Sequence, residues 1–65
     1  MKVQVNGEWR EVRAADLAGV ITELGFEHAV IATAVNDEFV PVGERAAFTL
    51  DDGDRIEVLA PMQGG

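Results

Sequence analysis

The segment "DLAGVITELG" (residues 16–25) decides the fold, because it carries the one clear helical pattern of the chain. Asp16 is a suitable N-cap residue, and Gly25 suits the position just after a helix end. Gly19 falls in the first turn, where it permits close packing. Four apolar residues recur at the spacing of a single helix face: Leu17, Val20, Ile21 and Leu24.

The residues before this helix predict a β-hairpin. "KVQV" (2–5) alternates polar and apolar residues, so Val3 and Val5 share one face of a strand. Asn6-Gly7 is a strong two-residue turn signal, because both residue types accept a positive φ. "EWREVR" (8–13) then reads as the return strand.

The residues after the helix predict three further strands. "AVIATAVN" is rich in β-branched residues and indicates a largely buried strand, and "EFV" is a short edge strand that ends at Pro41. A tight turn with a permissive Gly53 precedes the last strand. The segments are 29–36 and 38–40 for these strands, 43–48 for a short helical turn, 51–54 for the tight turn and 55–60 for the final strand.

The predicted order is therefore hairpin, helix, short hairpin and final strand, an α+β arrangement of the ββαββ type with a single helix. One helix covers one face of a sheet and leaves the other face against water. The final strand fills the gap beside the first strand and runs parallel to it. This is the mixed sheet of a β-grasp, or ubiquitin-like, fold. The predicted core is Val3, Val5, Val12, Leu17, Val20, Ile21, Leu24, Ile31, Leu50, Ile56 and Val58, and Phe26 and Phe48 are also expected to be core residues.

Length and charge restrict the classes of function. A chain of 65 residues forms one small domain, for which we expect bounds of 1–60, followed by an exposed, flexible tail over 61–65. With 12 acidic residues, 5 basic residues and a net charge of −7, the chain is unsuited to nucleic acid or an anionic membrane. The acidity suits either basic partner surfaces or simple solubility. We find no secretion signal or membrane span, and expect a cytoplasmic protein.

Three stretches together resemble a known family. They are "VNG" (5–7), "AVNDEFVP" (34–41) and "LDDGDRIEVLAPMQGG" (50–65), and the match runs over essentially the whole chain. The chain resembles the ThiS-type sulfur carriers of thiamine biosynthesis. The resemblance implies that an adenylating enzyme of the ThiF or MoeB type, related to ubiquitin-activating enzymes, uses ATP to activate the Gly65 carboxylate. Sulfur from a donor such as a cysteine desulfurase then gives a thiocarboxylate, which serves a ThiG-type thiazole synthase.

The ending "PMQGG" (61–65) suits that chemistry physically. A terminus without side chains can thread a narrow channel that keeps water from an acyl-adenylate. Gly65 would be the reacting residue, and Gly64, without a side chain, would fit the narrow channel. Gln63 and Met62 would lengthen the tail, and Pro61 would stiffen its start. The carrier would then be a co-substrate rather than an enzyme, with no bound cofactor of its own.

Several side chains are candidates for partner docking. Trp9 and Phe39 are placed on the open face of the sheet, where Met62 could join them; alternatively a bulge turns Trp9 into the core. Many family members have a basic residue after the "VP" at 40–41, where this chain has Val42, and Arg45 is close enough in sequence to replace it. The turn residues Asp52 and Asp54 are the remaining docking candidates.

The sequence favours no metal site. His28 is the single histidine, there is no cysteine, and His28 is expected to be solvated in a turn. Asp51, Asp52 and Asp54 lack the spacing and the closing glutamate of a calcium loop. An acidic turn is the simpler interpretation of these three residues.

Other functions remain open at the level of sequence. A carrier of the same mechanism could serve molybdopterin synthesis or tRNA thiolation. A second class is a ubiquitin-like modifier that forms isopeptide bonds through Gly65. A third is a non-covalent ubiquitin-like binding module, whose binding would survive deletion of Gly64 and Gly65.

Overall fold

The computed structural model describes residues 1–60, in which five strands form one mixed sheet of order β2-β1-β5-β3-β4. β1 and β5 are parallel, and the other neighbouring pairs are antiparallel. The elements, in chain order, are β1 (Lys2–Val5), β2 (Glu8–Glu11), α1 (Leu17–Glu23), β3 (Ala32–Val35), β4 (Glu38–Val40), a 3-10 helix η1 (Val42–Ala47) and β5 (Arg55–Leu59). The predicted β-grasp topology is confirmed, and the complete order of the five strands around the helix is ββαβββ.

Helix α1 begins and ends as its sequence indicates. The Asp16 side chain accepts a hydrogen bond from the Gly19 backbone N–H at 2.7 Å, which satisfies one of the free donors of the first turn. At the other end Gly25 has a φ of +91°, and the Phe26 N–H donates to the Ile21 carbonyl at 2.9 Å. This is a Schellman motif, which a residue with a Cβ would strain.

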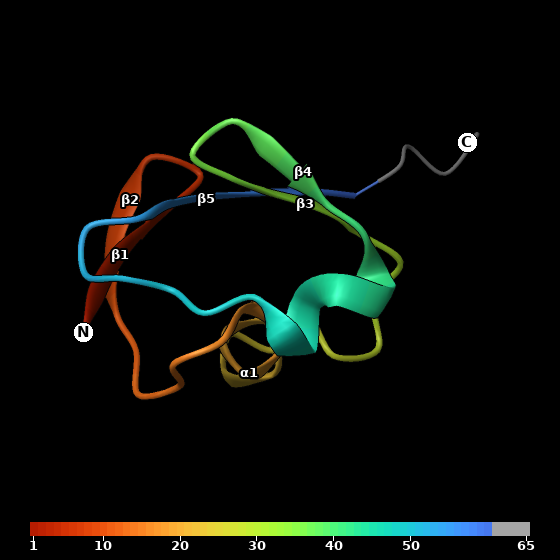
Figure 1. Ribbon diagram of the computed structural model, residues 1–65, viewed down its shortest axis with the longest axis horizontal. Helices are drawn as coiled ribbons and strands as arrows, with labels where there is room; N and C mark the ends of the chain where they lie inside the picture. The colour runs from red at the N-terminus through yellow and green to blue at the C-terminus, as the bar shows by residue number, and fades with distance from the viewer. Residues whose placement is uncertain (61–65) are drawn as a thin grey trace.

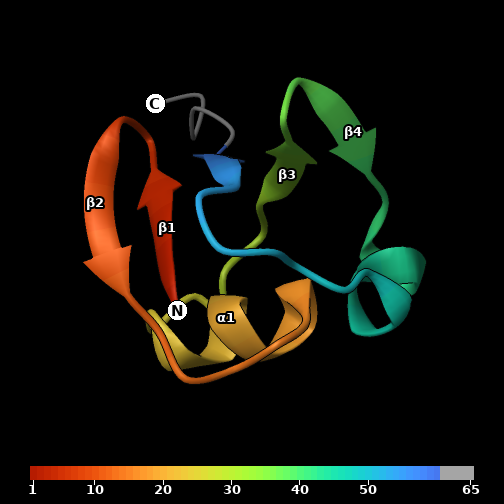
Figure 2. The same ribbon diagram turned by 60° about the vertical axis from the view of Figure 1, so that its left-hand side comes forward.

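The helix and η1 lie on the same side of the sheet, and no element within residues 1–60 covers the opposite face (Figures 1 and 2). The buried apolar residues lie between these layers, and every predicted core residue except Leu24, Phe26 and Phe48 is among them. Leu24 is only partly buried and packs against the core, as do Phe26 and Phe48. Two core residues were not predicted, Val35 and Val40, which share the helix-facing side of β3 and β4.

Strands β2 and β3 are shorter than the sequence predicts. β3 begins at Ala32 rather than at residue 29, because the Ala29 N–H donates to the Phe26 carbonyl and closes a turn after the helix. β2 ends at Glu11, because the backbone N–H groups of Arg13 and Ala14 donate to the Glu23 carboxylate instead of to a strand. The first correction arises from a local turn after the helix, and the second from a contact between the end of the helix and the connection that follows β2.

Candidate functional site

The candidate site is built on β5, the last strand before the C-terminal residues 61–65. β5 lies in the centre of the sheet, with Val5 opposite Ile56 on the β1 side and Ala32 opposite Leu59 on the β3 side. Its side chains alternate, with Ile56 and Val58 buried and the outward ones exposed. The strand is thus held on both sides before it reaches Ala60, the last residue described. The predicted sulfur site Gly65, and the tail residues Gly64, Gln63 and Met62, lie outside the described residues.

The side chain of Asn6 bonds to β5 beyond the point where the β1 backbone turns into the hairpin. Asn6 has a φ of +51°, as the predicted hairpin turn requires. Its Nδ2 donates to the Val58 carbonyl at 3.1 Å, and its Oδ1 accepts from the Val58 N–H at 2.8 Å. The side-chain amide therefore satisfies both backbone groups of Val58, close to the end of β5.

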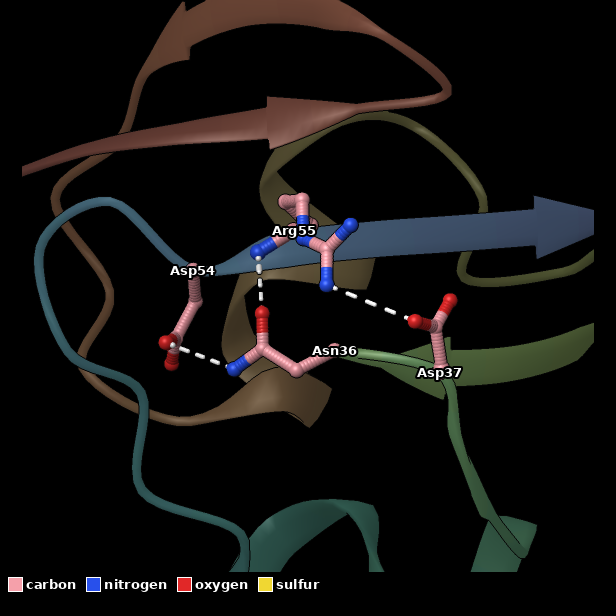
Figure 3. Close-up of polar contacts among 4 residues, drawn as sticks. All are labelled: Asn36, Asp37, Asp54 and Arg55. Carbon is pink, nitrogen blue, oxygen red and sulfur yellow. Dashed lines mark hydrogen bonds and ion pairs between the residues drawn. The ribbon is translucent and has the colours of Figure 1, made fainter.

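A second asparagine holds the start of β5 (Figure 3). Asn36, in the β3–β4 turn, has a φ of +50° and accepts from the Arg55 N–H at 3.0 Å, while its Nδ2 donates to Asp54 at 3.0 Å. The Arg55 guanidinium lies 3.4 Å from the Asp37 carboxylate, but both side chains are well exposed. Such an exposed ion pair contributes little to stability. The asparagine bonds are the specific part of this network.

An apolar hollow of about 310 Å³ lies beside the end of β5. Its large exposed members are Val30, with 77% of its surface accessible, and Leu59, with 64%. Exposed aliphatic side chains at one place often mark a contact surface. Among the described residues, the lining is Val30, Ile31, Ala32, Leu59 and Ala60.

The open face of the sheet carries both predicted aromatic residues. Trp9 is 59% exposed and lies opposite Gln4 in the β1–β2 ladder, while Phe39 is 64% exposed and lies opposite Ala34. The alternative in which a bulge turns Trp9 into the core is therefore wrong. A docking role for these two side chains stays a prediction, but both are placed where a partner could reach them.

Arg45 does not have the exposed position that docking would need. Only 9% of its surface is accessible, and its Nε donates to Thr33 Oγ1 at 3.0 Å. One Nη donates to the Ile31 carbonyl at 2.7 Å. The guanidinium thus ties η1 to β3 from inside the protein, which argues against its replacing the basic residue expected near Val42. Val42 itself is exposed.

The two aspartates predicted for docking form the turn before β5. Asp52 accepts from the Lys2 backbone N–H at 2.7 Å. Asp54 accepts from the Asp51 backbone N–H at 2.8 Å and from Asn36. Gly53 has a φ of +90°, as the predicted tight turn requires. These contacts give both carboxylates a structural task, and their docking role stays a prediction.

The described part of the chain carries neither a metal site nor a membrane-spanning helix. Within residues 1–60 no group of three or more His, Asp or Glu side chains is arranged to hold a metal ion. His28 is exposed in the turn after the helix, where the sequence places it. Neither α1 nor η1, the helices described, is long and apolar enough to cross a membrane.

Fold and site together define a class of protein: a small β-grasp domain whose central strand continues into the C-terminal segment. Comparison with known proteins identifies the family. A sequence model described as the ThiS family matches residues 3–65, and the chain belongs to this family.

Curated relatives support this assignment. The sulfur carrier protein ThiS of Thermus thermophilus is 40% identical over 63 residues, which cover 97% of this chain and 98% of that one. A thiazole synthase of Paramagnetospirillum magneticum is 35% identical over 66 residues. That match covers 100% of this chain but only 20% of the thiazole synthase, so the chain spans about a fifth of that relative's length.

Solved structures share the fold over the whole chain. The crystal structure of the thiamine biosynthesis protein ThiS from Geobacter metallireducens has a TM-score of 0.83 at 29% identity, with 100% of both chains covered. A solution structure of a thiamine biosynthesis protein from the same organism gives 0.78 at 28% identity and covers 100% of this chain and 88% of that one.

Sequence reasoning missed several residues of the site. The outward position of Leu59 could have been found, because it is in phase with Arg55 and Glu57 on β5. The exposure of Val30 could not, because an apolar run hides which residues precede the strand. The bonds of Asn6 to Val58 were also missed, since turn chemistry alone explains an asparagine at that position.

Proposed function

We propose that this chain is a sulfur carrier protein of thiamine biosynthesis. Its Gly65 carboxylate is activated by a partner enzyme, converted to a thiocarboxylate and used by thiazole synthase. The observation that carries the proposal is the ThiS family match, which extends from residue 3 through residue 65 on a matching β-grasp fold. Activation would take place in the cytoplasm, where ATP is available.

The chemistry begins with a poor electrophile. A carboxylate repels nucleophiles and has no good leaving group, so it must be activated before sulfur can enter. A Gly65 oxygen attacks the α-phosphorus of ATP, which forms an acyl-adenylate and releases pyrophosphate. The outer sulfur of a donor persulfide then attacks the acyl carbon and displaces AMP, which gives an acyl disulfide between carrier and donor. A thiol reductant attacks the donor's sulfur and breaks the S–S bond, so that a new disulfide forms on the donor and the thiocarboxylate remains on the carrier.

Glycine suits both terminal positions for steric reasons. The activating site must exclude water, because water would hydrolyse the adenylate. A terminus without Cβ atoms can enter a narrow site, and its backbone can approach the nucleotide closely. In this proposal the chain supplies the reacting carboxylate and its presentation, while ATP binding and acid–base groups belong to the partner. It acts as a co-substrate.

Thiazole synthase is the proposed sulfur acceptor. The thiazole synthase of Paramagnetospirillum magneticum has a segment that is similar to all of this chain and fills 20% of its length. A covalent link between two modules keeps them at a high effective concentration, which is useful when they act together. The open face with Trp9 and Phe39, and the hollow beside Leu59, are the proposed docking surfaces.

Intact mass spectrometry tests the proposal. The purified chain is incubated with a ThiF- or MoeB-type enzyme, ATP, cysteine and a cysteine desulfurase. We expect a mass gain equal to sulfur minus oxygen, which addition of thiazole synthase and its remaining substrates reverses. A variant lacking Gly64 and Gly65 is the control and should gain nothing. Mass of a conjugated protein would indicate a modifier, and an unchanged mass would reject the carrier function.

A further inference from the structure

We propose that Asn6 is a positioning residue for the C-terminal tail. This inference rests on the proposed carrier function and adds a residue far from the tail in sequence. Asn6 lies in the β1–β2 turn, and its side chain holds Val58 near the end of β5. By fixing this point, Asn6 sets the direction in which the chain leaves the sheet towards Gly65.

The geometry resembles a strand pairing that has been replaced by a side chain. The last backbone pair between β1 and β5 is Val5 with Ile56, and the Asn6 N–H donates to the Ile56 carbonyl at 2.9 Å. Beyond this point the β1 chain turns into the hairpin. The primary amide of Asn6 has its C=O and one N–H on the same side, and it uses both on Val58, as the C=O and N–H of a paired strand residue would.

The turn itself does not need these bonds. Position 6 requires a positive φ, which glycine adopts more easily than asparagine. A glycine there would keep the turn and the backbone bond to Ile56, and would lose only the two bonds to Val58. The contribution of the Asn6 side chain to the tail can therefore be separated from its contribution to the hairpin.

The position of Val58 explains why the effect would reach the tail. Within residues 1–60, Val58 is the last residue of β5 that receives a hydrogen bond from the β1–β2 hairpin. Leu59 is still paired with Ala32 on the β3 side. When the bonds to Val58 are lost, the end of β5 is held from one side only. Ordering the tail in a partner's site then carries a larger entropic cost.

Asn36 provides a matched control at the other end of the same strand. It also lies in a hairpin turn with a positive φ, and it also bonds a backbone N–H of β5 through its Oδ1 (Figure 3). Its bonds are at Arg55 and Asp54, where β5 begins. Asn36→Gly therefore removes equivalent bonds without touching the end of β5.

The test compares Asn6→Gly with Asn36→Gly in pyrophosphate exchange catalysed by a ThiF- or MoeB-type enzyme. Circular dichroism first fixes a temperature at which both variants are fully folded. For Asn6→Gly we expect KM for the carrier to rise about tenfold with kcat nearly unchanged, since roughly one extra residue must be ordered on binding. For Asn36→Gly we expect a change of less than about twofold in either constant.

A hydrogen-exchange measurement and a second variant of Asn6 make the outcome decisive. Hydrogen exchange of the isolated protein should show a faster Val58 amide in Asn6→Gly only. If Asn6→Gly fails to fold, Asn6→Asp, which keeps an acceptor for the Val58 N–H, takes its place and should also raise KM. Equal KM values for the two glycine variants would overturn the inference. Absence of exchange with the unmodified chain would instead reject the carrier function.

Discussion

Gly19 is a single residue where packing overrides helix propensity. It lies in the first turn of α1, and a Cβ built there would be 2.7 Å from the Ala14 Cβ. Alanine at a helix position is normally favoured by about 1 kcal/mol over glycine, but overpacking costs about 1–3 kcal/mol. Ala14 cannot move its Cβ away without moving the backbone. The predicted close packing at Gly19 thus has a defined partner.

We expect Gly19→Ala to lower the free energy of unfolding by about 1 kcal/mol, or the melting temperature by roughly 4–8 °C. Urea denaturation of the variant and the unmodified chain measures this. In the double variant Ala14→Gly/Gly19→Ala the clash is removed, so part of the loss should be recovered. A Gly19→Ala protein as stable as the original would show that the connection before α1 adjusts freely.

Arg45 illustrates a limit of residue-level prediction. A charged residue such as this one suggests exposure, because arginine is rarely buried without partners. Here the partners are Thr33 and the Ile31 carbonyl, which are distant in sequence and are brought to Arg45 only by the fold. Pairwise contacts of this kind leave no local periodic signal. The docking prediction for Arg45 failed to anticipate them for that reason.

Replacement of Arg45 by methionine tests its structural role. Methionine keeps much of the unbranched stem but cannot donate to the Ile31 carbonyl, and an unpaired buried carbonyl costs about 1–3 kcal/mol. We expect Arg45→Met to destabilise the protein by about 2 kcal/mol in urea denaturation. At a temperature where the variant is folded, its KM in the activation assay should be unchanged. A normal stability with a raised KM would instead support docking.

At the scale of elements, the connection between β2 and α1 depends on one carboxylate. Glu23, at the end of α1, accepts from the backbone N–H of Ala14 at 3.0 Å and from that of Arg13 at 3.0 Å. These backbone hydrogen bonds, from Ala14 and then Arg13, lower the pKa of Glu23 below its ordinary value. A group with a lowered folded-state pKa stabilises the fold above its unfolded pKa, and this contribution is lost as pH falls through the folded value.

Glu23→Gln should therefore lower the melting temperature at pH 7, since the amide has one acceptor oxygen and no charge. The difference in melting temperature between the variant and the unmodified chain should shrink as the pH falls below the ordinary pKa range of glutamate. It should disappear once Glu23 itself is protonated. Glu27→Gln, which removes the same charge from the exposed turn after α1, is the control and should lack this pH dependence. A deficit that persists undiminished in acid would contradict the role of the ionised carboxylate.

Elements with clear local signals were predicted well, and the bounds of two strands were not. The first hairpin turn, the helix caps and the Gly53 turn follow from residues within a few positions of each other. The ends of β2 and β3 were wrong, because Glu23 and the turn after the helix decide them. Val35 and Val40 were missed because an apolar run does not show which face is buried.

At the scale of the whole molecule, the two faces of the sheet have different roles, one in packing and the other in recognition. One face packs against α1 and η1 (Figure 1). The open face presents Trp9 and Phe39 among charged side chains. The sequence predicted this division, because a single helix can cover only one face. The use of the open face depends on a partner, and neither alternation nor composition specifies the shape of a partner.

For the open face we predict that substitutions weaken partner binding without changing the free energy of unfolding. Trp9 and Phe39 are largely exposed, so Trp9→Ser and Phe39→Ser should each change the free energy of unfolding by less than about 1 kcal/mol. Aromatic side chains that become buried in an interface commonly contribute more than 1 kcal/mol to binding, so KM in the activation assay should rise about fivefold or more. Stability is measured in urea and KM by pyrophosphate exchange.

The control is Ala47→Ser, which alters an exposed apolar residue of η1 on the helix side of the sheet. It should leave both stability and KM nearly unchanged, because a partner on the open face would not reach it. If the two aromatic variants react with normal KM, the partner approaches elsewhere, and the hollow beside Leu59 becomes the surface to test. If instead they unfold readily, the aromatic side chains stabilise the sheet itself, and their exposure is a poor guide to recognition.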